Sequence, residues 1–132
     1  MKKFPPERIV CLTEETVETI YLLGEEKRIV GVTGYATRPK QVRNEKPRIS
    51  SFISANIDKI VDLEPDLILA FSDIQSEIVS NLIKKGQSVL CFNQRDIEGI
   101  FNMIQTISNL LDIKQKGINL ISKLKNNIYQ IK

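Results

Sequence analysis

The sequence contains no histidine and no tryptophan among its 132 residues, and only two cysteines. Without histidine, the chain cannot build a Ser-His-Asp or Cys-His nucleophile system, or a metal site that depends on histidine. It also lacks the GxGxxG and GxxxxGK[ST] patterns that cradle phosphates in dinucleotide and P-loop sites. These absences favour a binding domain over an enzyme, and they predict neither a resident metal nor a cofactor.

Long apolar runs are missing as well. No run approaches the roughly 18 apolar residues of a membrane-spanning helix. The start MKKFPPERIV has two prolines where a signal peptide needs an apolar core, so we expect no signal peptide within this sequence. We therefore expect either a cytoplasmic protein or a mature form from which a signal was removed.

Size and charge indicate one folded domain. The chain is 42% hydrophobic and 27% charged, which is enough apolar material for a core. The net charge of the chain is +3. Residues 113–132 contain five lysines and no acidic residue, so residues 1–112 carry a net charge of 3 − 5 = −2. The body of the domain therefore does not have the charge of a nucleic-acid binder.

Short apolar runs alternate with stretches of helical period, which is the pattern of an α/β fold with a Rossmann-like parallel sheet and helices on both faces. The runs are continuously apolar, as expected for strands that are covered on both sides. The predicted strands are residues 8–12, 28–33, 66–71 and 88–92. We expect them in the order 2-1-3-4 with right-handed crossovers.

Helix signals lie between these strands. Thr13, Asn56 and Asp96 each precede a helical stretch as candidate N-caps. Gly24 follows the end of the stretch that Thr13 begins, and Gly86 closes the stretch over residues 76–86. Two long stretches at the C-terminal end each repeat apolar residues every three or four positions. These are residues 97–111, with Ile97, Ile100, Ile104, Ile107 and Leu111, and residues 113–132, with Ile118, Ile121, Leu124, Ile128 and Ile131. We divide the chain into an α/β lobe, residues 1–112, and a final long helix, residues 113–132.

Cys11 and Cys91 both fall inside predicted strands, where a buried, reduced thiol is the common state. In the predicted order one strand separates them. Their Cα atoms would then be roughly 10 Å apart, beyond the ~7 Å limit for a disulfide.

Candidate ligand residues follow the strand ends, because open parallel sheets bind ligands outside the carboxyl ends of their strands. Tyr35 and Phe71 place aromatic rings there, and Phe52 lies in the serine-rich segment RISSFISANI, which we predict to be a loop ahead of a helix cap. One such ring taken alone more often fills a local core, but three rings at one edge favour a pocket. The predicted ligand-binding set is Thr13, Tyr35, Ser51, Phe52, Phe71 and Ser72.

The segment RIVCLTEETVETIYLLGEEKRIVGVTGYATRP, followed by PRISSFISANIDKIVDLEPDLILAF, resembles the N-terminal lobe of vitamin B12 (cobalamin) binding proteins, within the iron-siderophore and corrinoid class of ABC-transporter substrate-binding proteins. That family has two α/β lobes joined by one long helix, with the ligand clamped between them. The resemblance implies that this chain supplies one lobe and the connecting helix, as a fragment or a truncated copy.

The same resemblance implies roles for individual residues. Tyr35, Phe52 and Phe71 fall where cobalamin binders present aromatic rings to the ligand. Asp58, at the start of a helix, falls where an acidic residue of those proteins meets the membrane permease. The implied location is periplasmic, or extracytoplasmic with a membrane anchor, and the implied partners are a small-molecule ligand and an ABC permease dimer.

Several alternatives stay open. Cobalamin binders often carry tryptophan where this chain has Phe52 and Phe71, so a ferric siderophore or haem is the nearest alternative ligand, and Arg38 and Arg48 could serve an anionic one. Manganese and zinc receptors of this architecture rely on histidine and are disfavoured. A regulatory or interaction domain without a transport role is the alternative from another class. A lone lobe should bind cobalamin weakly and could self-associate through its cleft face.

Overall fold

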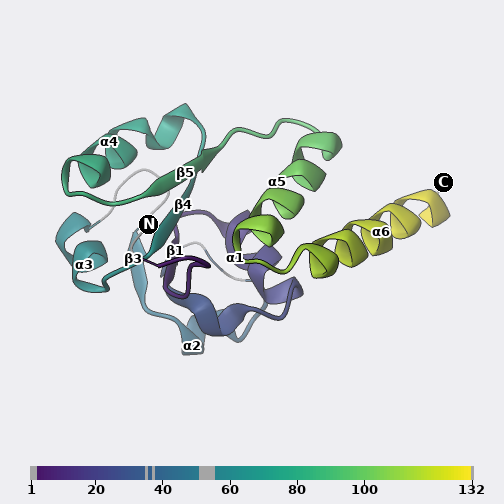
Figure 1. The fold of residues 1–132 in the computed structure, drawn as a ribbon, viewed down its shortest axis with the longest axis horizontal. Coiled ribbons are helices and arrows are strands. Elements are labelled where there is room, and N and C mark those ends of the chain that lie inside the picture. Colours follow the sequence, from purple (N-terminus) through teal and green to yellow (C-terminus); the bar gives the residue numbers. More distant parts are fainter. Residues whose placement is uncertain (1–2, 35, 37, 51–55, 132) are drawn as a thin grey trace.

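The computed structural model describes residues 3–34, 36, 38–50 and 56–131, and the account below concerns these residues. Its core is a parallel sheet in the order β3-β2-β1-β4-β5 (Figure 1). The strands are β1 (Ile9–Cys11), β2 (Ile29–Thr33), β3 (Arg48–Ser50), β4 (Leu67–Phe71) and β5 (Val89–Phe92). The helices are α1 (Glu14–Leu22), α2 (Val42–Glu45), α3 (Ile57–Asp62), α4 (Ser76–Lys84), α5 (Ile97–Leu110) and α6 (Lys114–Ile131), with 3₁₀ turns η1 (Glu26–Arg28) and η2 (Asp73–Gln75).

The four predicted strands lie side by side in the predicted order, which confirms the fold class. The prediction missed β3, since it assigned the serine-rich segment to a loop. Three residues with an arginine at their start give no apolar run. Within the described part of the chain this strand pairs only with β2, with a shift in register between Val32 and Thr33. An edge strand needs less apolar sequence than a central one, so its pattern is weak.

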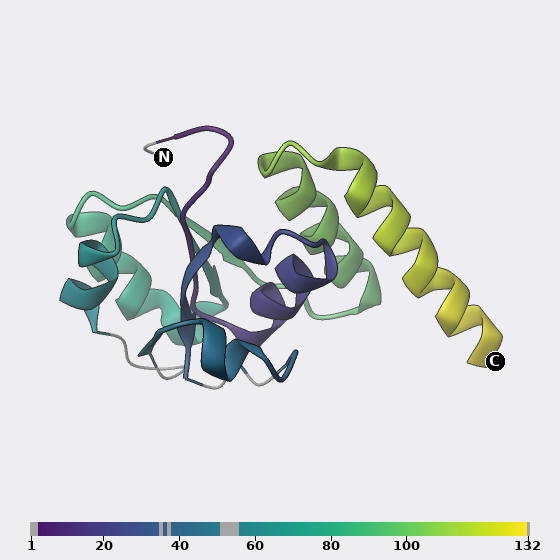
Figure 2. The same cartoon turned by 90° about the horizontal axis from the view of Figure 1, so that it is seen from below.

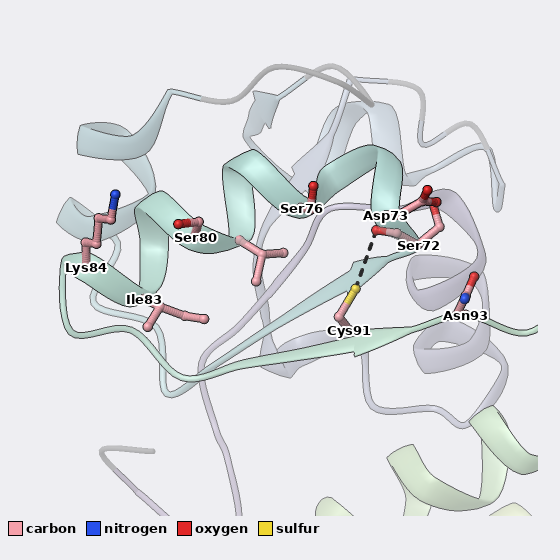
Figure 3. Close-up of a pocket in the computed structure, with 9 residues that line it drawn as sticks. Ser72, Asp73, Ser76, Ser80, Ile83, Lys84, Cys91 and Asn93 are labelled. Atoms are coloured by element: carbon pink, nitrogen blue, oxygen red, sulfur yellow. Dashed lines mark hydrogen bonds between the residues drawn. The ribbon is translucent and has the colours of Figure 1, made fainter.

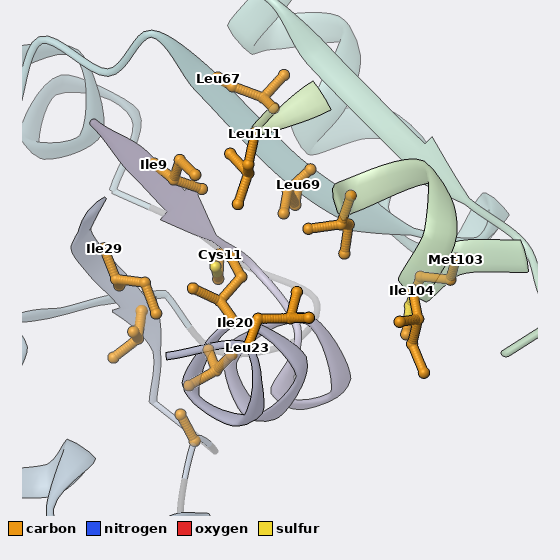
Figure 4. Close-up of a cluster of buried hydrophobic side chains, with 14 of the residues drawn as sticks. Ile9, Cys11, Ile20, Leu23, Ile29, Leu67, Leu69, Met103, Ile104 and Leu111 are labelled. Atoms are coloured by element: carbon orange, nitrogen blue, oxygen red, sulfur yellow. The ribbon is translucent and has the colours of Figure 1, made fainter. Parts of the chain in front are cut away.

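Two apolar layers cover the two faces of the sheet. On one face, side chains of β1, β2 and β4 pack against α1, α2 and α5 (Figure 4). On the other face, alternate residues of the same strands pack against α3 and α4. Neighbouring residues such as Ile9 and Val10 therefore point to opposite layers, and both are fully buried. This two-sided burial explains why the strands read as continuous apolar runs.

Two of the three predicted N-caps form as expected. Asn56 Oδ1 accepts a hydrogen bond from Lys59 N at 3.0 Å, and Asp96 Oδ1 accepts one from Gly99 N at 2.7 Å. Thr13 occupies the N-cap position of α1, but its side chain makes no capping bond. Its hydroxyl instead lies 3.0 Å from the hydroxyl of Thr16, and this buried pairing replaces the predicted cap.

The cysteines differ from each other. Cys11 is fully buried in β1, as predicted, and burial raises the pKa of its thiol to about 12. Cys91 is exposed, so the prediction that it is buried is wrong. It lies on β5, which among the described residues has β4 on one side and no strand on the other. Both thiols are free, and β4 separates their strands as expected.

The last two helices form an antiparallel hairpin. Gly117 of α6 meets Ser108 of α5 so closely that a Cβ at Gly117 would lie 2.5 Å from Ser108 Cβ and closer still to its hydroxyl. Ser108 is fully buried and donates its hydroxyl to Ile104 O at 2.7 Å. From this contact α6 runs outward, and its C-terminal end projects from the lobe (Figure 2).

Glu25 ties α6 to the segment between α1 and β2. Its carboxylate accepts hydrogen bonds from Lys116 Nζ at 2.5 Å and from Arg28 Nε at 2.8 Å. Only 15% of the Glu25 side chain is exposed. Burial by itself raises the pKa of Glu25, but the two cations outweigh it, so the pKa lies below its usual value.

We expect Glu25→Gln to lower the free energy of unfolding at pH 7 by about 2 kcal/mol, because it removes charge-assisted hydrogen bonds to two cations. Since the folded pKa is lowered, this stabilisation is present above the unfolded pKa of about 4.3 and is lost as the pH falls through the folded pKa. Urea unfolding at pH 7 and at about pH 3 checks this, because the difference should shrink at the lower pH. Glu15→Gln, at an exposed position of α1, is the control. An equal loss at both pH values would contradict the prediction.

Candidate functional site

The carboxyl ends of β1, β2, β4 and β5 meet at one edge of the sheet, and the residues that follow them form the candidate site. Thr13 follows β1 and Ser72 follows β4, while Phe71 ends β4. Phe71 is half-buried, whereas Thr13 is 1% exposed and Ser72 is 6% exposed. Phe71 is therefore the member of this trio that offers most surface to a ligand.

Gln75 holds two of these strand ends together, a role that sequence analysis missed. Its side-chain amide donates to Leu12 O at 3.0 Å, and its carbonyl oxygen accepts from Phe71 N at 2.9 Å. The residue is fully buried. Gln75 thus satisfies a backbone acceptor at the end of β1 and a backbone donor at the end of β4, which fixes the separation of the two strand ends.

Ser72 occupies a backbone position that glycine would favour, with φ of 61°. Its N–H donates to Phe92 O at 2.7 Å, and its hydroxyl accepts from Ile74 N at 3.2 Å. The turn after β4 therefore uses both groups of Ser72, and the predicted contact between its hydroxyl and a ligand stays a prediction.

Three members of the predicted set, Tyr35, Ser51 and Phe52, lie outside the described residues. Their roles as ligand contacts stay predictions. The segments that contain them follow β2 and β3, which are neighbours in the sheet.

The two arginines considered for anionic ligands differ in their surroundings. Arg38 Nε lies 3.5 Å from a carboxylate oxygen of Glu14 and 3.5 Å from one of Glu18, both on α1. Its side chain is 70% exposed, so this pairing is weak and leaves the guanidinium accessible. Arg48 is exposed on β3, and its carbonyl accepts from Lys59 Nζ at 3.1 Å.

Asp58 is exposed in the first turn of α3, directly after the Asn56 cap. A carboxylate is favoured at this end of a helix, and here it also faces solvent. Among the described residues, no three histidine, cysteine, aspartate or glutamate side chains gather as a set of metal ligands.

A sheet of this order with a candidate site at its carboxyl edge is compatible with one lobe of a two-lobed receptor. Comparison with known families identifies the family of the chain. The profile of the family described as periplasmic binding protein matches residues 9–132. The chain belongs to this family. The match confirms the resemblance found in the sequence, and it supports the prediction that the chain is a binding domain and not an enzyme.

Individual relatives agree with this assignment. An uncharacterized ABC transporter substrate-binding lipoprotein, YvrC, of Bacillus subtilis is 29% identical over 133 residues, which cover 98% of this chain and 42% of that protein. A vitamin B12-binding protein of Vibrio cholerae is 39% identical over 70 residues, which cover 53% of this chain and 25% of that protein.

A solved structure confirms the fold. The structure of a possible iron-binding (periplasmic solute-binding) protein from Staphylococcus epidermidis superposes with a TM-score of 0.88 and 26% identity, over 96% of this chain and 50% of that one. The chain thus spans half or less of the length of the relatives that it matches. No helix in the described ranges combines the length and the apolar character needed to cross a bilayer.

Proposed function

We propose that this chain forms the N-terminal ligand-binding lobe of an ABC importer's substrate-binding protein, with a cobalamin-like corrinoid as its ligand. The observation that supports this ligand most directly is the 39% identity to a vitamin B12-binding protein. The edge of the sheet suits such a ligand, because Phe71 offers an aromatic ring at the end of β4. An aromatic side chain buries a large area against a flat macrocycle at a small entropy cost.

In this proposal Gln75 positions the strand end that carries Phe71 without touching the ligand, and Ser72 forms the turn next to it. Gln75 fixes the end of β4 relative to β1, and the Ser72 turn directs the chain away from the edge into η2. The backbone around Phe71 is thereby held by Gln75 on the β1 side and by the bond from Ser72 N to Phe92 O on the β5 side. Tyr35 and Phe52 are the further rings that the proposal assigns to this platform.

The importer's membrane permease is the proposed protein partner, with Asp58 as a contact. An exposed acidic residue at the rim of an interface mainly steers encounter and orientation. The proposed location is extracytoplasmic, by analogy with the lipoprotein of Bacillus subtilis.

An iron-containing ligand is the second candidate, since the structure from Staphylococcus epidermidis is named as a possible iron-binding protein. An accessible guanidinium at Arg38 would suit an anionic ferric siderophore or the propionates of haem. A regulatory domain that uses the same fold without a transport role is the third candidate. It predicts no binding of any of these ligands.

Visible-absorbance titration with cobalamin, haem and a ferric siderophore distinguishes these candidates. We expect a saturable change with cobalamin only, at high micromolar or weaker affinity, because one lobe offers half of a clamshell's contacts. Phe71→Leu keeps an apolar side chain but removes the ring, and should weaken cobalamin binding about 2- to 10-fold. Phe4→Leu is the matched control, because Phe4 is 63% exposed and precedes β1 at the opposite edge. Saturable binding of haem or siderophore alone would replace the corrinoid proposal.

A further inference from the structure

Strand β5 is the last strand of the described sheet, and its outer edge has no partner strand. Ser88 O and Phe92 O accept hydrogen bonds from Ile68 N and Ser72 N on the β4 side. Because hydrogen-bonding directions alternate along a strand, Val89 and Cys91 between them direct their N–H and C=O groups outward. This edge therefore offers a short row of free backbone donors and acceptors.

The two edges of the sheet differ in how they are protected. The β3 edge carries Pro47 and Arg48 and has an irregular register, and these features discourage pairing with another strand. Strand β5 reads VLCF, with no proline, no charge and a regular register against β4. Although β5 is only four residues long, it therefore lacks the proline, charge and irregular register that would oppose pairing with another strand.

A groove of about 570 Å³ runs beside this edge, between α4 and β5. Val79, Ile83 and Cys91 give it an apolar lining, and 57% of Ile83 is exposed. Figure 3 shows Asp73 at one end of the groove and Lys84 at the other, with Cys91 on the β5 side. The groove thus carries opposite charges at its two ends.

We propose that two copies of this chain pair through antiparallel contact of their β5 edges, which joins two sheets into one. A two-fold axis perpendicular to the sheet keeps the α4 faces on the same side and reverses the direction of the strands. The acidic end of each groove then faces the basic end of the other, Asp73 toward Lys84 of the second copy. The apolar walls of the two grooves then contact each other across the axis and are buried from water.

This interface differs from the cleft face, for which the sequence analysis predicted self-association. The proposed interface uses the outer edge of β5 and the adjacent side of α4, which covers one face of the sheet, whereas the cleft face lies at the carboxyl ends of the strands. Dimers formed through β5 would leave Thr13 and Phe71 at the carboxyl edge free for a ligand, and of the described members of the predicted ligand set only Ser72 lines the groove. Pairing through β5 and ligand binding are therefore compatible.

Sedimentation of the 132-residue chain over roughly 1–200 µM tests the association. We expect a monomer–dimer equilibrium, which Cys91→Lys shifts to monomer because it places a charge on the edge strand. Asn102→Lys, which adds the same charge at an exposed position of α5, should leave the equilibrium unchanged. Circular dichroism confirms that both variants fold. A monomer over the whole range, or a dimer indifferent to Cys91→Lys, overturns the proposal.

Charge reversal tests the orientation. Asp73→Lys and Lys84→Asp should each weaken dimerisation roughly tenfold, because each change creates two like-charge contacts in a symmetric pair. The double variant, with both charges exchanged, should return toward the affinity of the original chain. Failure of the double variant to recover, with the single variants weakened, excludes the antiparallel arrangement.

Cross-linking through Cys91 tests the proposed β5 interface independently. Cys91 is exposed and Cys11 is fully buried, so a short bifunctional maleimide can join two folded chains only through Cys91. We expect a cross-linked dimer. In the Asp73→Lys variant the yield of this dimer should fall together with the fraction of dimer measured by sedimentation. Modification of Cys91 without cross-linking, at concentrations where the chain sediments as a dimer, would place the dimer contact elsewhere.

Discussion

Gly117→Leu should lower the free energy of unfolding by about 3 kcal/mol or more, because the space for any side chain at this position is already filled. The position faces Ser108, which is fully buried in the contact between α5 and α6. A leucine there cannot rotate into solvent without separating the two helices. The loss would appear in spite of the roughly 1 kcal/mol that replacing a helical glycine ordinarily contributes. Urea unfolding followed by circular dichroism measures it.

A smaller change at the same contact separates crowding from other effects. Gly117→Ala should also lower the free energy of unfolding. The double variant with Ser108→Gly should lose less than the sum of the two single losses, because Ser108→Gly removes the atoms that the new methyl group meets. Ser122→Leu adds a leucine at an exposed position of the same helix and should change stability little. Strict additivity in the cycle would mean that Gly117 is not a packing contact.

Gln75→Leu should lower the free energy of unfolding by about 2–4 kcal/mol, because it leaves one buried and one partly buried backbone group without partners. Leu12 O loses its donor, and Phe71 N loses its acceptor. Leucine has nearly the same size, so the effect reports polar satisfaction and not a cavity. Thermal or urea unfolding measures the loss.

The second consequence of this change is local. With the link between β1 and β4 gone, amide exchange at Leu12 and Phe71 should speed up more than exchange at the centre of the sheet. Gln115→Leu is the matched control, because Gln115 is exposed on α6 and bonds only with a neighbouring side chain in the same helix. Equal destabilisation by the two variants would refute the role assigned to Gln75.

The strands and helices that bury apolar residues on a regular period could be predicted from the sequence. Continuous apolar runs marked four strands, and the caps at Asn56 and Asp96 marked helix starts that the structure confirms. The period alone overstated burial at the start of α5, where Ile97 is 54% exposed and Ile100 is 41% exposed. Periodicity shows which residues share a face, but tertiary packing decides how much of that face is covered.

The candidate site was less predictable, for a physical reason. The topology rule gives the edge of the sheet where a ligand binds, and this placed Thr13, Phe71 and Ser72 near one another. It does not give the direction of each side chain, so it could not foresee that the Thr13 hydroxyl pairs with Thr16. Gln75 escaped notice because a single glutamine in a polar stretch carries no pattern. Its importance comes from two strand ends that are distant in sequence.

The tight contact at Gly117 also controls the direction of α6, so a small tilt there displaces the far end of the helix. From Gly117 to Ile131 the helix extends about 21 Å, at 1.5 Å per residue, while its base is fixed by Ser108 on one side and by the Lys116–Glu25 ion pair on another. A tilt of about 10° at this pivot moves the tip by about 4 Å. The smallest residue in the helix therefore sets the direction in which its far end points, and a single methyl group at the pivot would be magnified into a displacement larger than the width of a water molecule.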